Sequence, residues 1–243
     1  MLPHSAAMET WVRGAAEVAR GQIDAPHHAE QWRHAGTWCV GLDLLGNDRA
    51  GRVASGAPLP LDLPAGVAAW DGAQVSVCRA GYPGRDPGET KGAVRYRRLR
   101  DAAHVDGLLP IGPGRRRMLR ETHAVVIGLP LNACGAGASP LVVWEGGVAI
   151  LRAAFIKALA GVEVADWAEA DLTEVYHTAR ARCFAACTRR VVHAPLGAGY
   201  MVHRLALHGV APWEDGAESR PEGRMVAYFR PQLADMADWL AAP

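Results

Sequence analysis

The chain has 243 residues, half of them hydrophobic, which is enough for a substantial core in a single domain spanning residues 1–243. Its 26 Lys plus Arg nearly balance its 25 Asp plus Glu, so no overall field favours nucleic acid or an anionic membrane. No stretch has the pattern of a signal peptide or a membrane span, and the five scattered cysteines include no C-x-x-C pair. We therefore expect a cytoplasmic protein without a disulfide framework, and neither nucleic acid nor membrane as a partner.

The first expected element is an amphipathic helix. Apolar residues such as Met8 and Trp11 recur at helical spacing, which predicts a helical segment within residues 1–36 that ends in a His-rich turn. From Thr37 the sequence pattern changes to short apolar runs bounded by Gly, Pro, Asn or Asp, which predicts strands. These runs occupy residues 37–45, 73–80, 123–131, 140–144, 199–210 and 226–230.

Two further segments interrupt the strands. Residues 81–92 are rich in Gly and Pro and are expected to form a mobile loop, and residues 147–190 have a helical pattern. Long Gly- and Pro-rich connections, without regular alternation of strand and helix, favour antiparallel double sheets over a parallel α/β sheet. The predicted fold class is therefore mainly β with flanking helices (α+β), with a core at about 37–230 and a helical insertion at about 147–190.

A short H-x-D motif carries the first candidate chemistry. His104 and Asp106 are two residues apart, so in an extended strand both side chains leave the same face and can bind one ion. An imidazole with a carboxylate suits a divalent transition metal, and a third ligand would still leave positions free for substrate and oxygen. The motif alone is weak, because chance produces about 0.5 such pairs in a chain with this many His and Asp residues.

Two histidines compete for the place of third ligand. His203 and His208 are five residues apart, so in one regular strand they point to opposite faces and only one of them can join the motif. His208 is favoured because it ends an apolar run and is followed by Gly209, which permits close approach of another backbone. Further along, Arg224 opens another apolar run, and its guanidinium is suited to bind the carboxylate of a 2-oxo acid co-substrate.

The order of H-x-D, a late His-Gly and a downstream Arg resembles the phytanoyl-CoA dioxygenase family of Fe(II)/2-oxoglutarate-dependent oxygenases. The resemblance covers about residues 94–230 and is carried most closely by MVHRLALHGV. It implies a double-stranded β-helix (a cupin-like jelly roll) and Fe(II) bound by His104, Asp106 and His208. It also implies that Arg224 binds the far carboxylate of 2-oxoglutarate, and that molecular oxygen and a small-molecule substrate react there.

Several departures keep alternatives open. The segment between His208 and Arg224 is longer than usual in the family, so Arg220 competes for the carboxylate, and Val210 replaces a frequent hydroxyl residue. A looser similarity is to bacterial BsmA-like proteins, which are linked to biofilm and stress phenotypes. One alternative is therefore a non-catalytic metal- or ligand-binding protein of the same fold, and another is a structural β-sandwich without metal. The basic run Arg115–Arg117 favours a solvated loop over the entrance for an acidic substrate; substrate and oligomeric state stay open.

Overall fold

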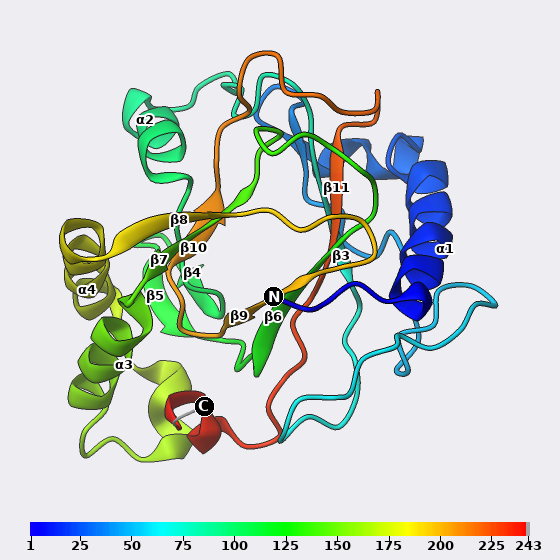
Figure 1. Cartoon of the computed structure of the whole chain (residues 1–243). Coiled ribbons are helices and arrows are strands. Elements are labelled where there is room, and N and C mark those ends of the chain that lie inside the picture. The colour runs from blue at the N-terminus through cyan, green and yellow to red at the C-terminus, as the bar shows by residue number, and fades with distance from the viewer. Residues whose placement is uncertain (242–243) are drawn as a thin grey trace.

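A six-stranded antiparallel sheet organises residues 1–241, which the computed structural model describes (Figure 1). Its strand order is β1-β2-β3-β11-β6-β9, so the strand nearest the end of the chain lies in the middle of the sheet. The bounds are β1 Trp32–Arg33, β2 Trp38–Cys39, β3 Gln74–Cys78, β6 Val125–Pro130, β9 Tyr200–His203 and β11 Arg224–Phe229.

A second antiparallel sheet has the order β10-β7-β8, and a separate hairpin pairs β4 with β5. The bounds are β4 Leu108–Ile111, β5 Arg116–Leu119, β7 Leu141–Glu145, β8 Thr188–Val192 and β10 His208–Val210. From β6 to β11 the chain passes repeatedly between the two larger sheets, because β6, β9 and β11 belong to the first and β7, β8 and β10 to the second.

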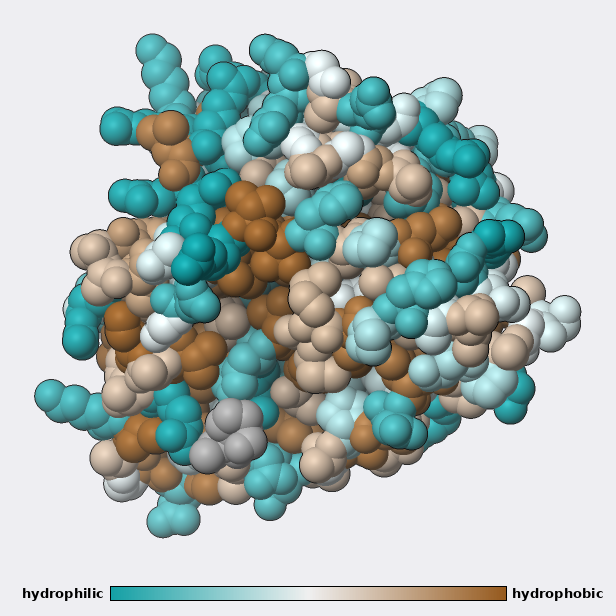
Figure 2. Space-filling model, in the orientation of Figure 1, coloured by the Kyte–Doolittle hydropathy of each residue, from teal (hydrophilic) through white to brown (hydrophobic). Residues whose placement is uncertain are grey.

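Helices cover the outer face of each sheet. Figure 1 shows α1 beside the six-stranded sheet and α3 with α4 on the opposite side of the molecule. The helices are α1 Ala6–Gln22, α2 Lys91–Arg100, α3 Gly147–Ala158 and α4 Thr173–Ala186, with 3-10 turns η1 Pro26–Gln31, η2 Val164–Glu169 and η3 Met236–Leu240. Hydrophilic side chains project around the corner that carries α2 (Figure 2). None of the helices within residues 1–241 is both long and apolar enough to cross a membrane.

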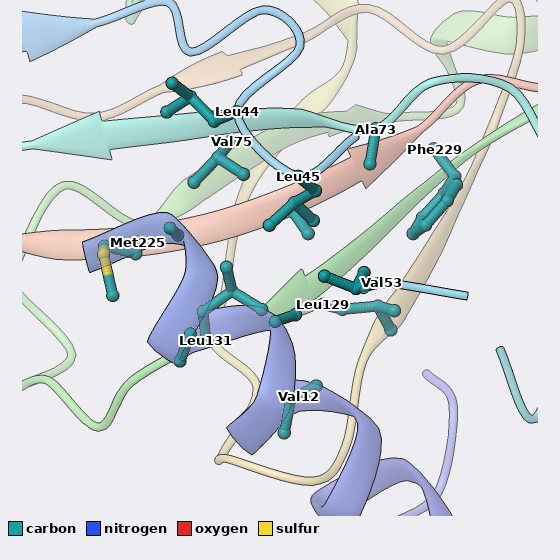
Figure 3. Close-up of a cluster of buried hydrophobic side chains, with 14 of the residues drawn as sticks. Val12, Leu44, Leu45, Val53, Ala73, Val75, Leu129, Leu131, Met225 and Phe229 are labelled. Carbon is teal, nitrogen blue, oxygen red and sulfur yellow. The ribbon is translucent and has the colours of Figure 1, made fainter. Parts of the chain in front are cut away.

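Alternation along the central strand β11 separates two cores. Met225, Ala227 and Phe229 point outward into a cluster that includes Val12 of α1 (Figure 3), because successive side chains leave opposite faces of a strand. Val226 and Tyr228 point inward instead, into a cluster with side chains of β6, β7 and β9. Since this inward cluster contains residues of both larger sheets, the two sheets pack face to face around it. A third cluster lies between the smaller sheet and α3 with α4.

The structure confirms a mixed fold of helices and antiparallel sheets and places a strand in each predicted run. The helical pattern at residues 147–190 corresponds to α3, η2 and α4, but helix α4 ends at Ala186 and strand β8 begins at Thr188. The β-branched residues of β8 find a pairing partner in β7, and this tertiary pairing ends the helix earlier than the sequence pattern does. In the first run, β2 covers only Trp38–Cys39.

Several elements were not predicted, among them a helix and the strand that contains the basic run. The segment after residue 90 forms α2, whose N-cap Thr90 accepts a hydrogen bond from the backbone N–H of Ala93. Its many charged residues give no apolar stripe, so the periodicity used for the other helices is missing. The basic run was also misjudged, because Arg116 and Arg117 belong to strand β5 and are not part of a loop.

Candidate metal centre

The two candidate histidine ligands are joined through their backbones. His104 N–H donates to the carbonyl of His208 at 2.8 Å, and His208 N–H donates to the carbonyl of His104 at 3.0 Å. This bridge is isolated, so the H-x-D segment is not the regular strand that the motif suggested, and Asp106 lies in the turn that follows. The bridge nevertheless brings the imidazole ring centroids to 4.8 Å from each other.

The side chains of His104, Asp106 and His208 converge on one point. Asp106 Oδ1 lies 3.1 Å from His104 Nε2 and 3.7 Å from His208 Nε2, and one ligand atom from each residue lies within 4.8 Å of the others. Both Nδ1 atoms lie at hydrogen-bond distance from a backbone carbonyl, that of Ala102 at 3.0 Å and that of Ala206 at 2.9 Å. With the proton on Nδ1, each Nε2 presents its lone pair, as metal-binding histidines require.

The competing histidine lies elsewhere. His203 Nδ1 accepts a hydrogen bond from the backbone N–H of Leu205 at 3.0 Å, and His203 is absent from the metal-ligand groups within residues 1–241. Of the two histidines weighed from the sequence, the fold therefore brings His208 to the H-x-D motif.

Gly209 is required by its surroundings. A Cβ atom at this position would lie 2.0 Å from the carbonyl oxygen of Asp101, which no side chain can tolerate. The same carbonyl accepts the backbone N–H of Val210 at 2.9 Å, and Arg189 binds the Asp101 carboxylate through two nitrogens at 2.8 Å each. The close approach expected after His208 is thus a real contact, and it fixes the segment before His104 against β10.

An arginine that the sequence reasoning missed completes the centre. Arg230, the residue directly after β11, donates from Nε to Asp106 Oδ2 at 2.6 Å and from Nη1 to the side-chain oxygen of Gln74 at 2.7 Å. Its backbone N–H donates to both oxygens of Asp71, at 2.9 and 3.0 Å. The spacing contained a signal, since Arg224 and Arg230 are six residues apart and an even separation places both on one face of a strand.

Burial and charge set the protonation states. Burial lowers the pKa of His208 to about 4, so its imidazole is neutral at pH 7. Burial alone would raise the pKa of Asp106, but its contacts with the imidazoles of His208 and His104 and the charge of Arg230 together hold that pKa well below its usual range. Burial opposes protonation of His104, yet its contact with Asp106 raises the pKa of this half-exposed imidazole. An anionic carboxylate beside a neutral imidazole is the state that binds a cation.

A cavity of about 590 Å³ opens beside these ligands and is within the size range of small-molecule sites. Its walls come from both larger sheets, with Gln74, Ser76 and Tyr228 on one side and Leu141 and Val210 on the other. Trp38, Tyr82 and Leu109 add apolar surface, and Arg117 and Arg230 contribute charge. Arg117, which was expected in a solvated loop, therefore faces the candidate site.

Arg224 and Arg220 have different surroundings. Arg224 is 5% exposed, and its Nε and Nη2 atoms have no hydrogen-bond partner within residues 1–241. It lies on the inner side of β11 with Val226 and Tyr228, although it does not itself line the cavity. Arg220 is exposed in the loop before β11. A buried guanidinium with unpaired donors is costly and is suited to an anionic ligand.

A second group of possible ligands, His34, Asp86 and Glu89, fits a structural role better. The Asp86 carboxylate accepts the backbone N–H groups of His34 and Ala35 at 2.8 and 2.6 Å, and both oxygens of Glu89 bind the guanidinium of Arg97. Because these carboxylates are already engaged, the group ties the segment before β2 to the loop before α2.

The comparisons with known proteins do not assign the chain to a family. No protein-family model matches the chain, and no curated protein is detectably similar to it. The resemblance to the phytanoyl-CoA dioxygenase family therefore stays a prediction from motifs.

Proposed function

We propose that the chain is an Fe(II)/2-oxoglutarate-dependent dioxygenase that hydroxylates a small molecule, similar to the phytanoyl-CoA dioxygenase family. The observation that carries the proposal is the convergence of His104, Asp106 and His208 beside a cavity between two sheets. Two imidazoles and one carboxylate on one side of a site, with open positions opposite, are typical of non-haem Fe(II) oxygenases. The proposed arrangement of the facing sheets is a jelly roll, since the chain crosses between them repeatedly from β6 to β11, with only β7 and β8 following each other in one sheet.

The donor set fits a divalent transition metal. His104 and His208 present Nε2, and Asp106 presents Oδ1. The other side of each ligand is held in place, because each Nδ1–H donates to a backbone carbonyl and Asp106 Oδ2 accepts from Arg230. When bound, Fe(II) with 2-oxoglutarate and oxygen supplies an oxidative decarboxylation that yields succinate, carbon dioxide and a hydroxylated product. The protein's part is to bind and orient the reactants, with Trp38, Tyr82 and Leu109 limiting the access of water to the cavity.

Arg224 is the proposed receptor for the far carboxylate of 2-oxoglutarate. Its Nε and Nη2 atoms are buried on the inner side of β11 without a hydrogen-bond partner within residues 1–241. A co-substrate carboxylate would satisfy donors that the described residues leave free. Arg220 has no comparable need because it is exposed to solvent.

The proposal is tested by titrating 2-oxoglutarate into Mn(II)-loaded protein in a calorimeter, without oxygen chemistry. We expect one site per chain, at least tenfold weaker binding for Arg224→Gln, and unchanged binding for the exposed control Arg220→Gln. Binding that survives Arg224→Gln but is lost in Arg220→Gln would move the receptor to Arg220. Metal binding with no 2-oxoglutarate binding would favour the non-catalytic metal- or ligand-binding alternative.

A further inference from the structure

Asp106 is less firmly held by the backbone than its two partners. His104 and His208 bond each other through both backbone groups, whereas Asp106 lies in a turn outside the strands. Its carboxylate nevertheless has a defined position, because the side chain is only 10% exposed and each of its two oxygens contacts a neighbouring side chain. Something other than the strand pairing must therefore hold the carboxylate group in position.

Each oxygen of Asp106 faces a different neighbour. Oδ1 faces the imidazoles, at 3.1 Å from His104 Nε2 and 3.7 Å from His208 Nε2. Oδ2 accepts the Nε–H of Arg230 at 2.6 Å. The guanidinium is itself fixed, because its Nη1 donates to Gln74 on β3. Its backbone is also fixed, because the N–H of Arg230 binds the carboxylate of Asp71.

We propose that Arg230 is a positioning residue that holds Asp106 as a one-oxygen ligand, with Oδ1 directed to the metal and Oδ2 withheld from it. This inference rests on the proposed metal site. A planar guanidinium with several donors in a fixed fork can bind Asp106 and Gln74 together, which an ammonium group cannot do with the same geometry. Withholding one carboxylate oxygen leaves more of the metal's positions available on the cavity side.

The test uses Co(II) as the probe, because its visible absorption reports the number and geometry of ligands. We expect Arg230→Gln to bind Co(II) about 10–100-fold more weakly than the unaltered protein, the usual cost of removing a partner that orients a metal ligand. We also expect a changed absorption spectrum, because Oδ2 is then free to coordinate. Arg230→Lys, which keeps the charge, should fall between the two in affinity and also serves if Arg230→Gln does not fold.

Arg79→Gln is the matched control. It removes another arginine–aspartate pair, in which Arg79 Nη2 donates to the two oxygens of Asp24 at 2.8 and 3.0 Å, and neither residue belongs to the metal group or lines the cavity. It should bind Co(II) with the affinity and spectrum of the unaltered protein. Equal effects of Arg79→Gln and Arg230→Gln would overturn the specific role of Arg230.

The remaining outcomes separate this inference from the proposed function. Unaltered protein that binds no Co(II) would overturn the metal site itself. Co(II) binding by Arg230→Gln with unchanged affinity and spectrum would overturn only the positioning role. If that variant instead loses binding of 2-oxoglutarate while Co(II) affinity is unchanged, Arg230 is the receptor for the co-substrate and the positioning role is wrong.

Discussion

The two faces of strand β11 have opposite chemistry. On the outer face, Met225, Ala227 and Phe229 are fully buried among apolar residues of α1 and the neighbouring strands. On the inner face, Arg224 has donors without a partner among residues 1–241, and Arg230, just beyond the strand, contacts Asp106. One face therefore contributes apolar burial to stability, and the other carries polar groups that are costly to bury unless they have a partner. The pattern indicates that β11 stabilises the fold through its outer face and directs arginine side chains towards the candidate site on its inner face.

The largest effect on metal binding, without loss of the fold, is expected when a metal ligand is removed. Asp106→Ala should abolish Co(II) binding, because it removes the only anionic ligand from a group of three. Far-ultraviolet circular dichroism should show an unchanged fold. Co(II) affinity is measured by competition with a chelator, and unchanged affinity in this variant would mean that the metal binds elsewhere.

An outer-face change should show the reverse pattern. Phe229→Ala deletes a fully buried ring that contacts Trp11 and Trp70 at centroid distances of 5.7 and 5.6 Å. We expect the free energy of unfolding to fall by about 3–5 kcal/mol. Urea denaturation measures this loss, and the folded fraction should keep its Co(II) affinity. A variant that loses affinity while fully folded would show that the two faces are coupled.

Acid should destabilise the protein through a histidine outside the metal group. Burial, assisted by Arg204 and Arg152, lowers the pKa of His203 to about 4 from an ordinary 6.5. The unfolded chain therefore takes up this proton first, so the contribution is complete above pH 6.5 and is lost as the pH falls towards 4. The loss should be on the order of 2 kcal/mol, allowing for partial exposure.

Urea unfolding at pH 7 and pH 4.5 measures that loss, with His203→Asn as the comparison. The asparagine oxygen can still accept the backbone N–H of Leu205, which the histidine Nδ1 binds at 3.0 Å, but it does not titrate. The variant should lose less stability than the unaltered protein over this range. Equal losses in both proteins would assign the acid sensitivity to other groups.

The smallest expected effect lies on the helix that covers the outer face. Ser5 caps α1 by accepting the backbone N–H of Met8 at 3.1 Å, so Ser5→Ala should reduce stability by about 1 kcal/mol. Thr10→Ala, on the exposed side of the same helix, should change stability by less than about 0.5 kcal/mol. Thermal unfolding compares the two, and neither substitution should affect Co(II) affinity.

The candidate ligands could be predicted because their signals are local. The H-x-D motif and the glycine after His208 identified residues that the structure brings together, although through an isolated bridge and a turn and not through the regular strand that the spacing suggested. Arg230 was missed because its role depends on a contact with a residue 124 positions away in the sequence. Its even spacing from Arg224 indicates a shared face but does not indicate that contact.

Helices and strands, too, could be predicted only where the sequence contains a local signal. Apolar runs such as Val125–Pro130 were predicted as strands because both faces of these strands are buried. Helix α2 and the strand containing Arg117 were missed, because neither has the apolar periodicity on which such predictions depend. Their structure is set by capping at Thr90 and by pairing with β4.

We propose that His104, Asp106 and His208 bind one Fe(II) and that 2-oxoglutarate chelates this ion. The most direct test is to add Fe(II) and then 2-oxoglutarate to anaerobic protein and record the weak visible charge-transfer band of the chelate. We predict that the band saturates at one Fe(II) per chain and is lost in His208→Ala. Stoichiometric iron without the band would contradict the oxygenase, and a failure to bind iron would contradict the site.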